Sequence, residues 1–151
     1  MNTIQTQGNS DTGEKSQAVL FLSMGNGSVP LGAGGEPLAI QEQRILGYRK
    51  AGTLDARVVQ EFVEIGVSAR DYRKRALLLA MLTYLGEHPH VRYVIFPSLG
   101  RFSRSHADFV ALQRRFKKLG VDVFCATGDI IVGVNETDAF MAQLIAAAQS
   151  I

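Results

Sequence analysis

Two arginines three residues apart, Arg101 and Arg104, follow an apolar run that is typical of a buried strand. Pro97 and Gly100 predict a short loop after that strand, and residues 105–108 predict a helix start. Guanidinium groups where the carboxyl end of a strand meets a helix N-terminus are well suited to phosphate oxygens. The same arginines could equally be solvated loop residues, and the residues alone leave both interpretations open.

Other residues with possible chemistry are weaker candidates. Ser68 follows a predicted strand and precedes a basic cluster containing Lys74, so its hydroxyl could donate to a phosphate or simply form a turn. Cys125 is expected to be a small core residue. Residues 88–90 hold two histidines without partners at metal-binding spacing, so neither a metal nor another cofactor is expected. Residues 25–30 lack the third glycine of a dinucleotide loop, and no P-loop motif occurs.

The charge of the chain is distributed unevenly. Residues 66–118 carry a net charge of +8, whereas residues 1–65 carry −2 and residues 119–151 carry −4. A basic central segment suits a polyanion such as nucleic acid. Part of this charge is expected to form a solvated helix face, made of Arg114, Arg115, Lys117 and Lys118.

Length and composition indicate a single globular domain. The chain has 151 residues, of which 46% are hydrophobic, and no apolar run approaches the roughly 18 residues of a membrane helix. It has no signal-peptide pattern, and its single cysteine makes a reducing cytoplasm the default location. Residues 1–17 are polar without periodicity and are expected to be a disordered leader to a domain spanning residues 18–151.

Hydrophobic periodicity predicts strands and helices in alternation. The strands are expected at residues 18–24, 58–64, 93–96, 121–126 and, as a short edge strand, 130–134; the helices are expected at 38–51, 75–86, 105–119 and from 136 to the end. In the first helix, Leu38, Ile45 and Tyr48 are predicted to face inward. This order predicts a three-layer α/β fold, with a mostly parallel sheet of four to five strands and helices on both faces. Functional groups should gather at the carboxyl ends of the strands.

Five segments occur in an order that is characteristic of a known family. They are a helix start at residues 38–41, then residues 62–69 with Lys74 shortly after, 94–104, 119–121 and 144–149. Together they make residues 18–151 resemble the catalytic domain of the serine recombinases, the resolvase/invertase family. The resemblance implies a resolvase-like fold and DNA cleavage without a metal, in which a serine attacks the phosphodiester and arginines stabilise the transition state.

The resemblance also implies which positions carry the chemistry. In register with the family, Gly25 stands at the position of the nucleophilic serine and Ser23 at that of the first arginine. Arg101 and Arg104 match the two arginines of the family's Asp-Arg-x-x-Arg motif, with Gly100 in place of the acid. The remaining positions expected to bind phosphate or DNA are Gln41, Ser68 and Lys74.

Because glycine cannot form a phosphoserine ester, the resemblance implies a catalytically impaired domain that acts, if at all, as an accessory or remnant DNA-recombination protein of a mobile element. One alternative is an active recombinase with a displaced nucleophile, Ser23 or Ser28; another is an α/β module that binds a phosphorylated ligand unrelated to DNA.

No residue follows Ile151, so the family's C-terminal DNA-binding module is expected to be missing. The expected partners are DNA, bound weakly through its phosphates, and a second copy or a recombinase-type subunit.

Overall fold

One five-stranded sheet organises the domain. The computed structural model describes residues 15–25 and 31–134. The strand order is β2-β1-β3-β4-β5, with β5 antiparallel to β4 and all other neighbours parallel. The strands are β1 (Ser16–Met24), β2 (Ala56–Ile65), β3 (Val91–Phe96), β4 (Asp122–Cys125) and β5 (Ile130–Val132). The predicted α/β class and the mostly parallel sheet are therefore confirmed.

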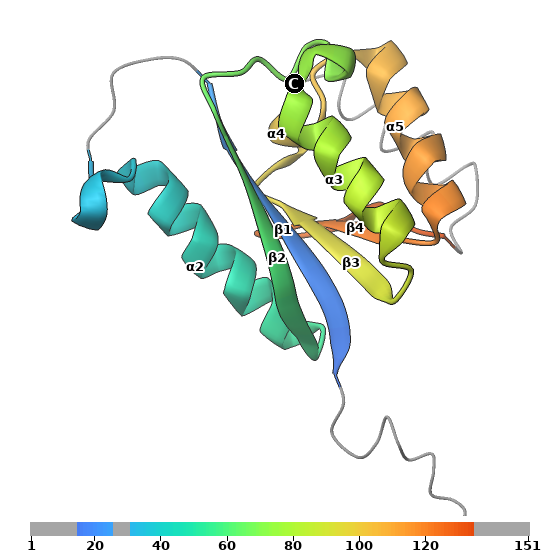
Figure 1. The fold of residues 1–151 in the computed structure, drawn as a ribbon, viewed down its shortest axis with the longest axis horizontal. Helices are drawn as coiled ribbons and strands as arrows, with labels where there is room; N and C mark the ends of the chain where they lie inside the picture. The colour runs from blue at the N-terminus through green and yellow to red at the C-terminus, as the bar shows by residue number, and fades with distance from the viewer. Residues whose placement is uncertain (1–14, 26–30, 135–151) are drawn as a thin grey trace, which may run out of the picture.

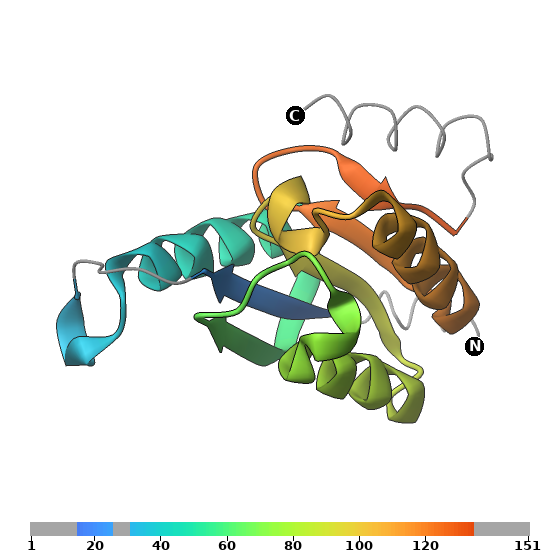
Figure 2. The same ribbon diagram turned by 90° about the horizontal axis from the view of Figure 1, so that it is seen from above.

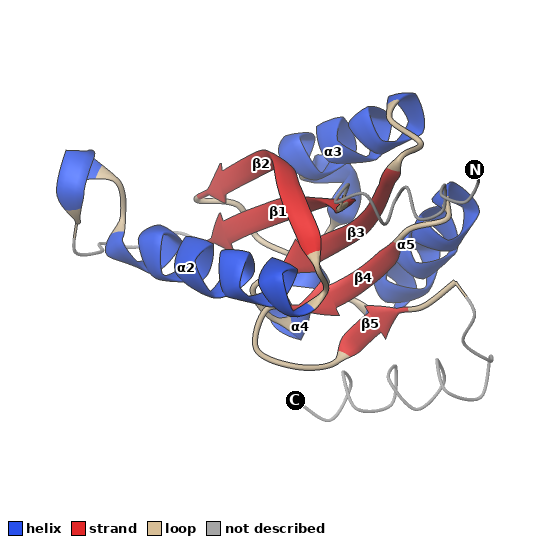
Figure 3. Cartoon of the chain, turned by 90° about the horizontal axis from the view of Figure 1, so that it is seen from below, coloured by secondary structure: helices blue, strands red, loops and turns tan. Residues whose placement is uncertain are grey.

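Helices cover both faces of this sheet. Helix α2 (Leu38–Thr53) lies on one face, whereas α3 (Ala76–Glu87) and α5 (His106–Leu119) lie on the other (Figures 1 and 3). Three short helices follow the carboxyl ends of β1, β2 and β3, respectively η1 (Ala33–Gly35), η2 (Tyr72–Lys74) and α4 (Leu99–Phe102). Seen from above, α4 lies over the edge of the sheet at which β3 ends, and a loop joins it to α5 (Figure 2). No helix among the described residues is long and apolar enough to cross a membrane.

Side chains of β1 alternate between two hydrophobic clusters, as a central strand requires. Leu20 and Leu22 pack in the cluster under α2, whereas Val19 and Phe21 pack in the larger cluster under α3 and α5. The next residue on the α3 side is Ser23, which is also fully buried. The alternation of β1 therefore places a hydroxyl group where the apolar core reaches the carboxyl edge of the sheet.

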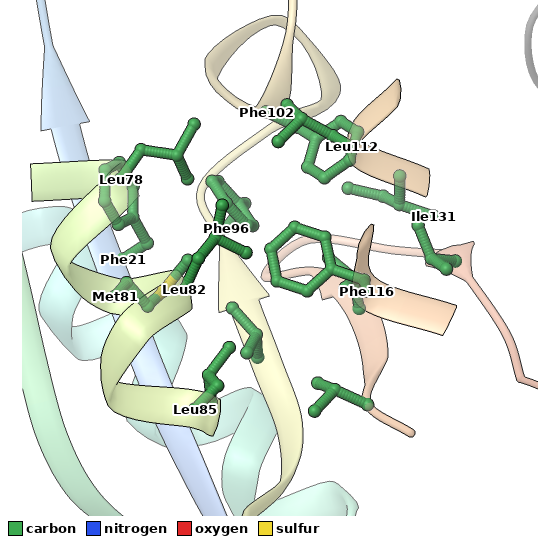
Figure 4. Close-up of a cluster of buried hydrophobic side chains, with 14 of the residues drawn as sticks. Phe21, Leu78, Met81, Leu82, Leu85, Phe96, Phe102, Leu112, Phe116 and Ile131 are labelled. Carbon is green, nitrogen blue, oxygen red and sulfur yellow. The ribbon is translucent and has the colours of Figure 1, made fainter. Parts of the chain in front are cut away.

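Aromatic rings fill the larger cluster (Figure 4). The ring of Phe96 lies between those of Phe21 and Phe116, with centroid distances of 5.0 Å and 6.3 Å. Phe102 of α4 adds edge contacts to Phe96 and to Phe109 of α5. Since aromatic pairs of this kind stabilise by more than their buried area, α4 is held firmly against the core.

Helix α5 agrees with its prediction in detail. The Ser105 hydroxyl accepts a hydrogen bond from the backbone N–H of Asp108 at 3.3 Å, and Gly120 ends the helix in the left-handed conformation with φ of 74°. The expected solvated face is also present, since three of its basic residues are exposed: Arg114, Arg115 and Lys118.

Helix α2 contradicts the prediction of its inward face. Leu38, Ile45 and Tyr48 are 40%, 59% and 49% exposed. The helix instead turns its Gly47 side toward the sheet, where a Cβ atom would lie only 3.0 Å from the side chain of Leu20. Because a glycine lets the backbone approach the strand closely, this face is buried in place of the apolar stripe.

Two further boundaries differ from the predictions. Strand β1 begins at Ser16, inside the predicted leader, because it pairs with β2 from its first residue. The loop predicted around Gly100 is helix α4, whose start is capped by the Ser98 hydroxyl, which accepts from the N–H of Arg101. The rest of the predicted leader, residues 1–14, and the predicted last helix lie outside the described residues.

Candidate phosphate-binding site

The connections after β1, β2 and β3 meet at one edge of the sheet, as the topology requires. The segment between β2 and α3 is tied to its neighbours at three points. The N–H of Gly66 donates to the carbonyl of Met24 at 2.9 Å, that of Arg104 to Ala69 at 2.9 Å, and that of Tyr72 to the Asp108 carboxylate at 2.8 Å.

A buried ion pair lies under this edge. The side chains of Arg75 and Glu64 are 0% and 1% exposed, and the guanidinium grips the carboxylate with two hydrogen bonds of 3.0 Å and 2.8 Å. The same guanidinium donates to the carbonyls of Phe102 and Arg101, each at 2.8 Å. Both residues of α4 are therefore fixed by a charge that could not remain buried without these partners.

The Arg101 side chain turns inward toward the same carboxylate. Its Nε and Nη2 atoms donate to the Ser23 hydroxyl oxygen at 3.0 Å and 2.7 Å, and Nη2 also donates to the carbonyl of Val67 at 2.8 Å. Nη2 lies 3.6 Å from Glu64. Partial burial, together with the nearby charge of Arg75, lowers the pKa of Arg101 below its ordinary value.

Ser23 joins β1 to this cluster. Its hydroxyl donates to the Glu64 carboxylate at 2.6 Å, and the side chain is 0% exposed. The Gln43 side chain of α2 satisfies the Ser23 backbone, accepting from its N–H and donating to its carbonyl, each at 2.8 Å. Every polar group of Ser23 therefore has a partner.

The remaining nitrogen of Arg101 faces position 25. A Cβ atom built on Gly25 would lie 4.0 Å from Nη1 of Arg101, which is the nearest atom among the described residues other than those next to Gly25 in the chain. Gly25 does not have a positive φ, so a side chain could be carried there without backbone strain. No described residue accepts a hydrogen bond from Nη1. Within the described part of the chain, the two N–H groups of Nη1 therefore have no acceptor and are directed at position 25, where the residue has no side chain.

The charges of the site are not balanced. Glu64 supplies one negative charge against the buried guanidinium of Arg75 and the partly buried guanidinium of Arg101. Arg104 is exposed, and its charge is close enough to depress the pKa of Arg101 further. An oxyanion at this edge would therefore be attracted by an excess of positive charge and met by available N–H donors.

Four of the predicted site residues come together here, namely Ser23, Gly25, Arg101 and Arg104. The other described candidates take no part in the hydrogen bonds among Ser23, Glu64 and Arg101. The Ser68 hydroxyl accepts from the N–H of Arg70 at 3.2 Å, which is the turn interpretation of this residue. Lys74 is exposed at the end of η2, and the Gln41 side chain lies against Gly32 at the start of α2. Ser28 lies outside the described residues.

Sequence reasoning did not find Glu64, Arg75 and Gln43. Glu64 follows Phe62 by two residues, so both side chains lie on the same face of the strand. This spacing could have indicated that Glu64 is buried. Arg75 immediately precedes the apolar run of α3, yet its neighbours Arg73 and Lys74 are both exposed, so the sequence did not show which cation turns inward. No feature of the sequence distinguishes Gln43 from the other polar residues of α2.

Metal and thiol chemistry have little support within residues 15–25 and 31–134. These residues contain no group of three or more His, Cys, Asp and Glu side chains able to hold a metal ion. Cys125 packs against the larger hydrophobic cluster, and burial together with the charge of Asp129 raises the pKa of its thiol to about 11. A thiol with this pKa is a poor nucleophile at neutral pH.

Comparison with known proteins agrees with this architecture. The family model "Resolvase, N terminal domain" matches residues 32–151, so Ser23 and Gly25 precede the matched segment. Among curated proteins, no sequence matches this chain significantly.

Three solved structures share the fold. A resolvase family site-specific recombinase from Streptococcus pneumoniae has a TM-score of 0.66 and 20% identity, covering 90% of this chain and 87% of that one. The N-terminal catalytic domain of TP901-1 integrase has a TM-score of 0.64 and 15% identity, covering 89% and 92%. The C-terminal catalytic domain of ISC1926 TnpA, an IS607-like serine recombinase, has a TM-score of 0.53 and 17% identity, covering 88% and 78%. The chain therefore belongs to the resolvase family, and it has the fold of a serine-recombinase catalytic domain.

Proposed function

We propose that this domain binds the phosphate backbone of DNA and does not cut it. The observation that carries the proposal is that a hydrogen-bond donor is directed at the nucleophile position, where no hydroxyl group is present. Arg101 directs Nη1, which has no acceptor among the described residues, toward position 25, and the residue at that position is a glycine. A phosphate oxygen held by Arg101 and Arg104 would find no hydroxyl beside it, so the bound diester would stay intact.

Ser23 is poorly placed to replace the nucleophile. Attack on phosphorus needs a free lone pair and access to the substrate. The Ser23 hydroxyl oxygen accepts two hydrogen bonds from Arg101 and is fully buried. Its short hydrogen bond to Glu64 resembles a nucleophile paired with a base, but it directs the hydroxyl into the core. Ser28 is the other displaced candidate, and the gel assay described below addresses both serines.

The affinity for DNA should be modest and strongly dependent on salt. The connections after β2 and β3 carry four exposed cations, which suit phosphates rather than base edges: Arg70, Arg73, Lys74 and Arg104. Neutralising about two to four phosphates predicts a slope of roughly −2 to −4 in a plot of log affinity against log salt concentration. Such a domain would act in recombination as an accessory component, paired with a second copy or with a recombinase-type subunit.

A denaturing gel tests the absence of cleavage. The protein is incubated with supercoiled and linear duplex DNA, then resolved under conditions that retain only covalent complexes. We expect no protein–DNA adduct and no strand breaks. An adduct that disappears in Ser23→Ala or Ser28→Ala would refute the proposal and identify the displaced nucleophile.

A binding titration tests the phosphate grip. Arg101→Ala should weaken duplex binding by about tenfold. Arg115→Ala on the exposed face of α5 is the matched control, since it removes the same charge from a surface that the proposal does not use. Equal losses for the two variants would indicate non-specific attraction. Binding that responds weakly to salt, and only to a small phosphorylated compound, would favour the ligand-binding alternative.

A further inference from the structure

We infer that Ser23 is a positioning residue that aims Arg101 at the bound phosphate. The inference rests on the proposed phosphate binding. The resemblance places Ser23 at the position of the family's first arginine, and Ser23 is also a candidate displaced nucleophile. A positioning role differs from both. Ser23 contacts the side chains of Glu64 and Arg101, and it lies on a strand that neither of them belongs to.

The hydrogen-bond stoichiometry of the hydroxyl supports this role. A serine hydroxyl has one proton and two lone pairs. The proton goes to Glu64 at 2.6 Å, which leaves both lone pairs for the Nε and Nη2 donors of Arg101 at 3.0 Å and 2.7 Å. Because the carboxylate cannot donate, the direction of these three bonds is fixed. The hydroxyl therefore bridges the carboxylate of Glu64 and the guanidinium of Arg101, whose nearest charged atoms are 3.6 Å apart.

The anchored edge of Arg101 determines where its free edge points. Nε and Nη2 are held by Ser23 and by the carbonyl of Val67, and the guanidinium is planar, so Nη1 must face position 25. An arginine already fixed in its binding geometry loses little side-chain entropy when the ligand arrives. The ligand recognised is a phosphate oxygen, either of a diester in DNA or of a free phosphate.

The support for Ser23 itself is independent of the ligand. Its backbone is held by Gln43, and its carboxylate partner is held by Arg75. These contacts keep the hydroxyl in place whether or not phosphate is bound. The removal of the hydroxyl should therefore act mainly on Arg101, whose Nε–H then loses its acceptor in a partly buried environment.

The test is a double-mutant cycle on phosphate binding. Wild type, Ser23→Ala, Arg101→Ala and the double variant are titrated against a short fluorescent duplex, and inorganic phosphate is used as a competitor to separate diester from free-phosphate binding. Ser23→Ala should lower the duplex affinity roughly tenfold in the wild-type background and have almost no effect when Arg101 is already alanine. Ser103→Ala is the matched control, since this serine is also buried, but its hydroxyl bonds to the backbone of Ser105 and not to Arg101.

Several outcomes would overturn the inference. An unchanged affinity in Ser23→Ala, the same loss in the Arg101→Ala background, or an equal loss in Ser103→Ala would each indicate that Ser23 does not act through Arg101. If Ser23→Ala fails to fold, Ser23→Cys takes its place in the cycle.

A measurement without substitution keeps the two proposals distinct. In the NMR spectrum of the free wild-type protein, the Nε–H of Arg101 should exchange slowly with solvent because it is bonded to Ser23. Rapid exchange at this group would refute the positioning role even if DNA binds. Slow exchange in a protein that binds neither duplex nor phosphate would instead refute the proposed function and leave the contact purely structural.

Discussion

Substituting Arg75 with methionine should destabilise the domain severely. The change keeps an unbranched apolar stem but removes the buried guanidinium and its four hydrogen bonds, two to Glu64 and two to the carbonyls of α4. The carboxylate of Glu64 would then stay buried with a single close partner, the hydroxyl of Ser23.

The expected cost follows from what remains around Glu64. Breaking a buried ion pair by removing one partner typically costs about 3–5 kcal/mol. Arg101 stays 3.6 Å from the carboxylate and offsets part of its charge, so we expect the lower end, about 3 kcal/mol. For a domain of this size that corresponds to a decrease in Tm of on the order of 10 °C.

Urea denaturation followed by circular dichroism measures this cost, and a double variant tests its origin. Glu64→Gln combined with Arg75→Met removes the stranded charge, so it should be more stable than Arg75→Met alone by about 1–2 kcal/mol. A cost below about 1 kcal/mol for Arg75→Met would refute the reasoning. So would a double variant whose cost equals the sum of the two single costs, because the pair would then contribute no coupling.

Three smaller predictions follow from single residues. Gly25→Ser should change the free energy of unfolding by less than about 1 kcal/mol in urea denaturation, because its φ is not positive and the nearest atom of the described residues beyond its chain neighbours is 4.0 Å from the added Cβ; a larger loss would show that position 25 is not open. Cys125 should react with iodoacetamide far more slowly at pH 8 in the native protein than in urea, because a pKa raised to about 11 keeps the thiol protonated, and equal rates would contradict this. Gly120→Ala should cost about 1 kcal/mol because φ is 74°, whereas Gly52→Ala within α2 should stabilise by a few tenths; similar changes in Tm would refute the assignment to backbone conformation.

The order of strands and helices was predictable because it depends on local features. In α5, the periodicity of apolar residues, the Ser105 cap and the Gly120 stop each fix the structure within a few residues of chain, and these three predictions are confirmed. The convergence of Ser23, Gly25, Arg101 and Arg104 was also predictable, since parallel strands bring their carboxyl ends to one edge.

The orientation of α2 could not be predicted by the same reasoning. Its apolar residues Leu38, Ile45 and Tyr48 form a stripe at helical spacing, but the close approach at Gly47 decides which face meets the sheet. The advantage of that approach depends on Leu20, a residue on another element. Packing between distant segments therefore outweighed the local pattern.

The inward turn of Arg75 was unpredictable for a related reason. Three consecutive cations end the connection after β2, and only the last of them meets a carboxylate in the core. Its selection depends on the position of Glu64 and on two carbonyls of α4, a helix that the sequence did not predict. The chemistry of a buried charge is set by partners that lie 11 to 27 residues away in the chain.

The buried pair of Arg75 and Glu64 is weaker evidence for function than the partly buried Arg101. Arg75 and Glu64 have all their partners within the fold, so a domain that binds nothing would still need them for stability. Arg101 differs, because the described residues bond to one edge of its guanidinium and leave Nη1 directed at position 25. A half-buried cation with unused donors is costly to maintain without an anion. The case for phosphate binding therefore depends on Arg101, and the double-mutant cycle with Ser23 is its most direct test.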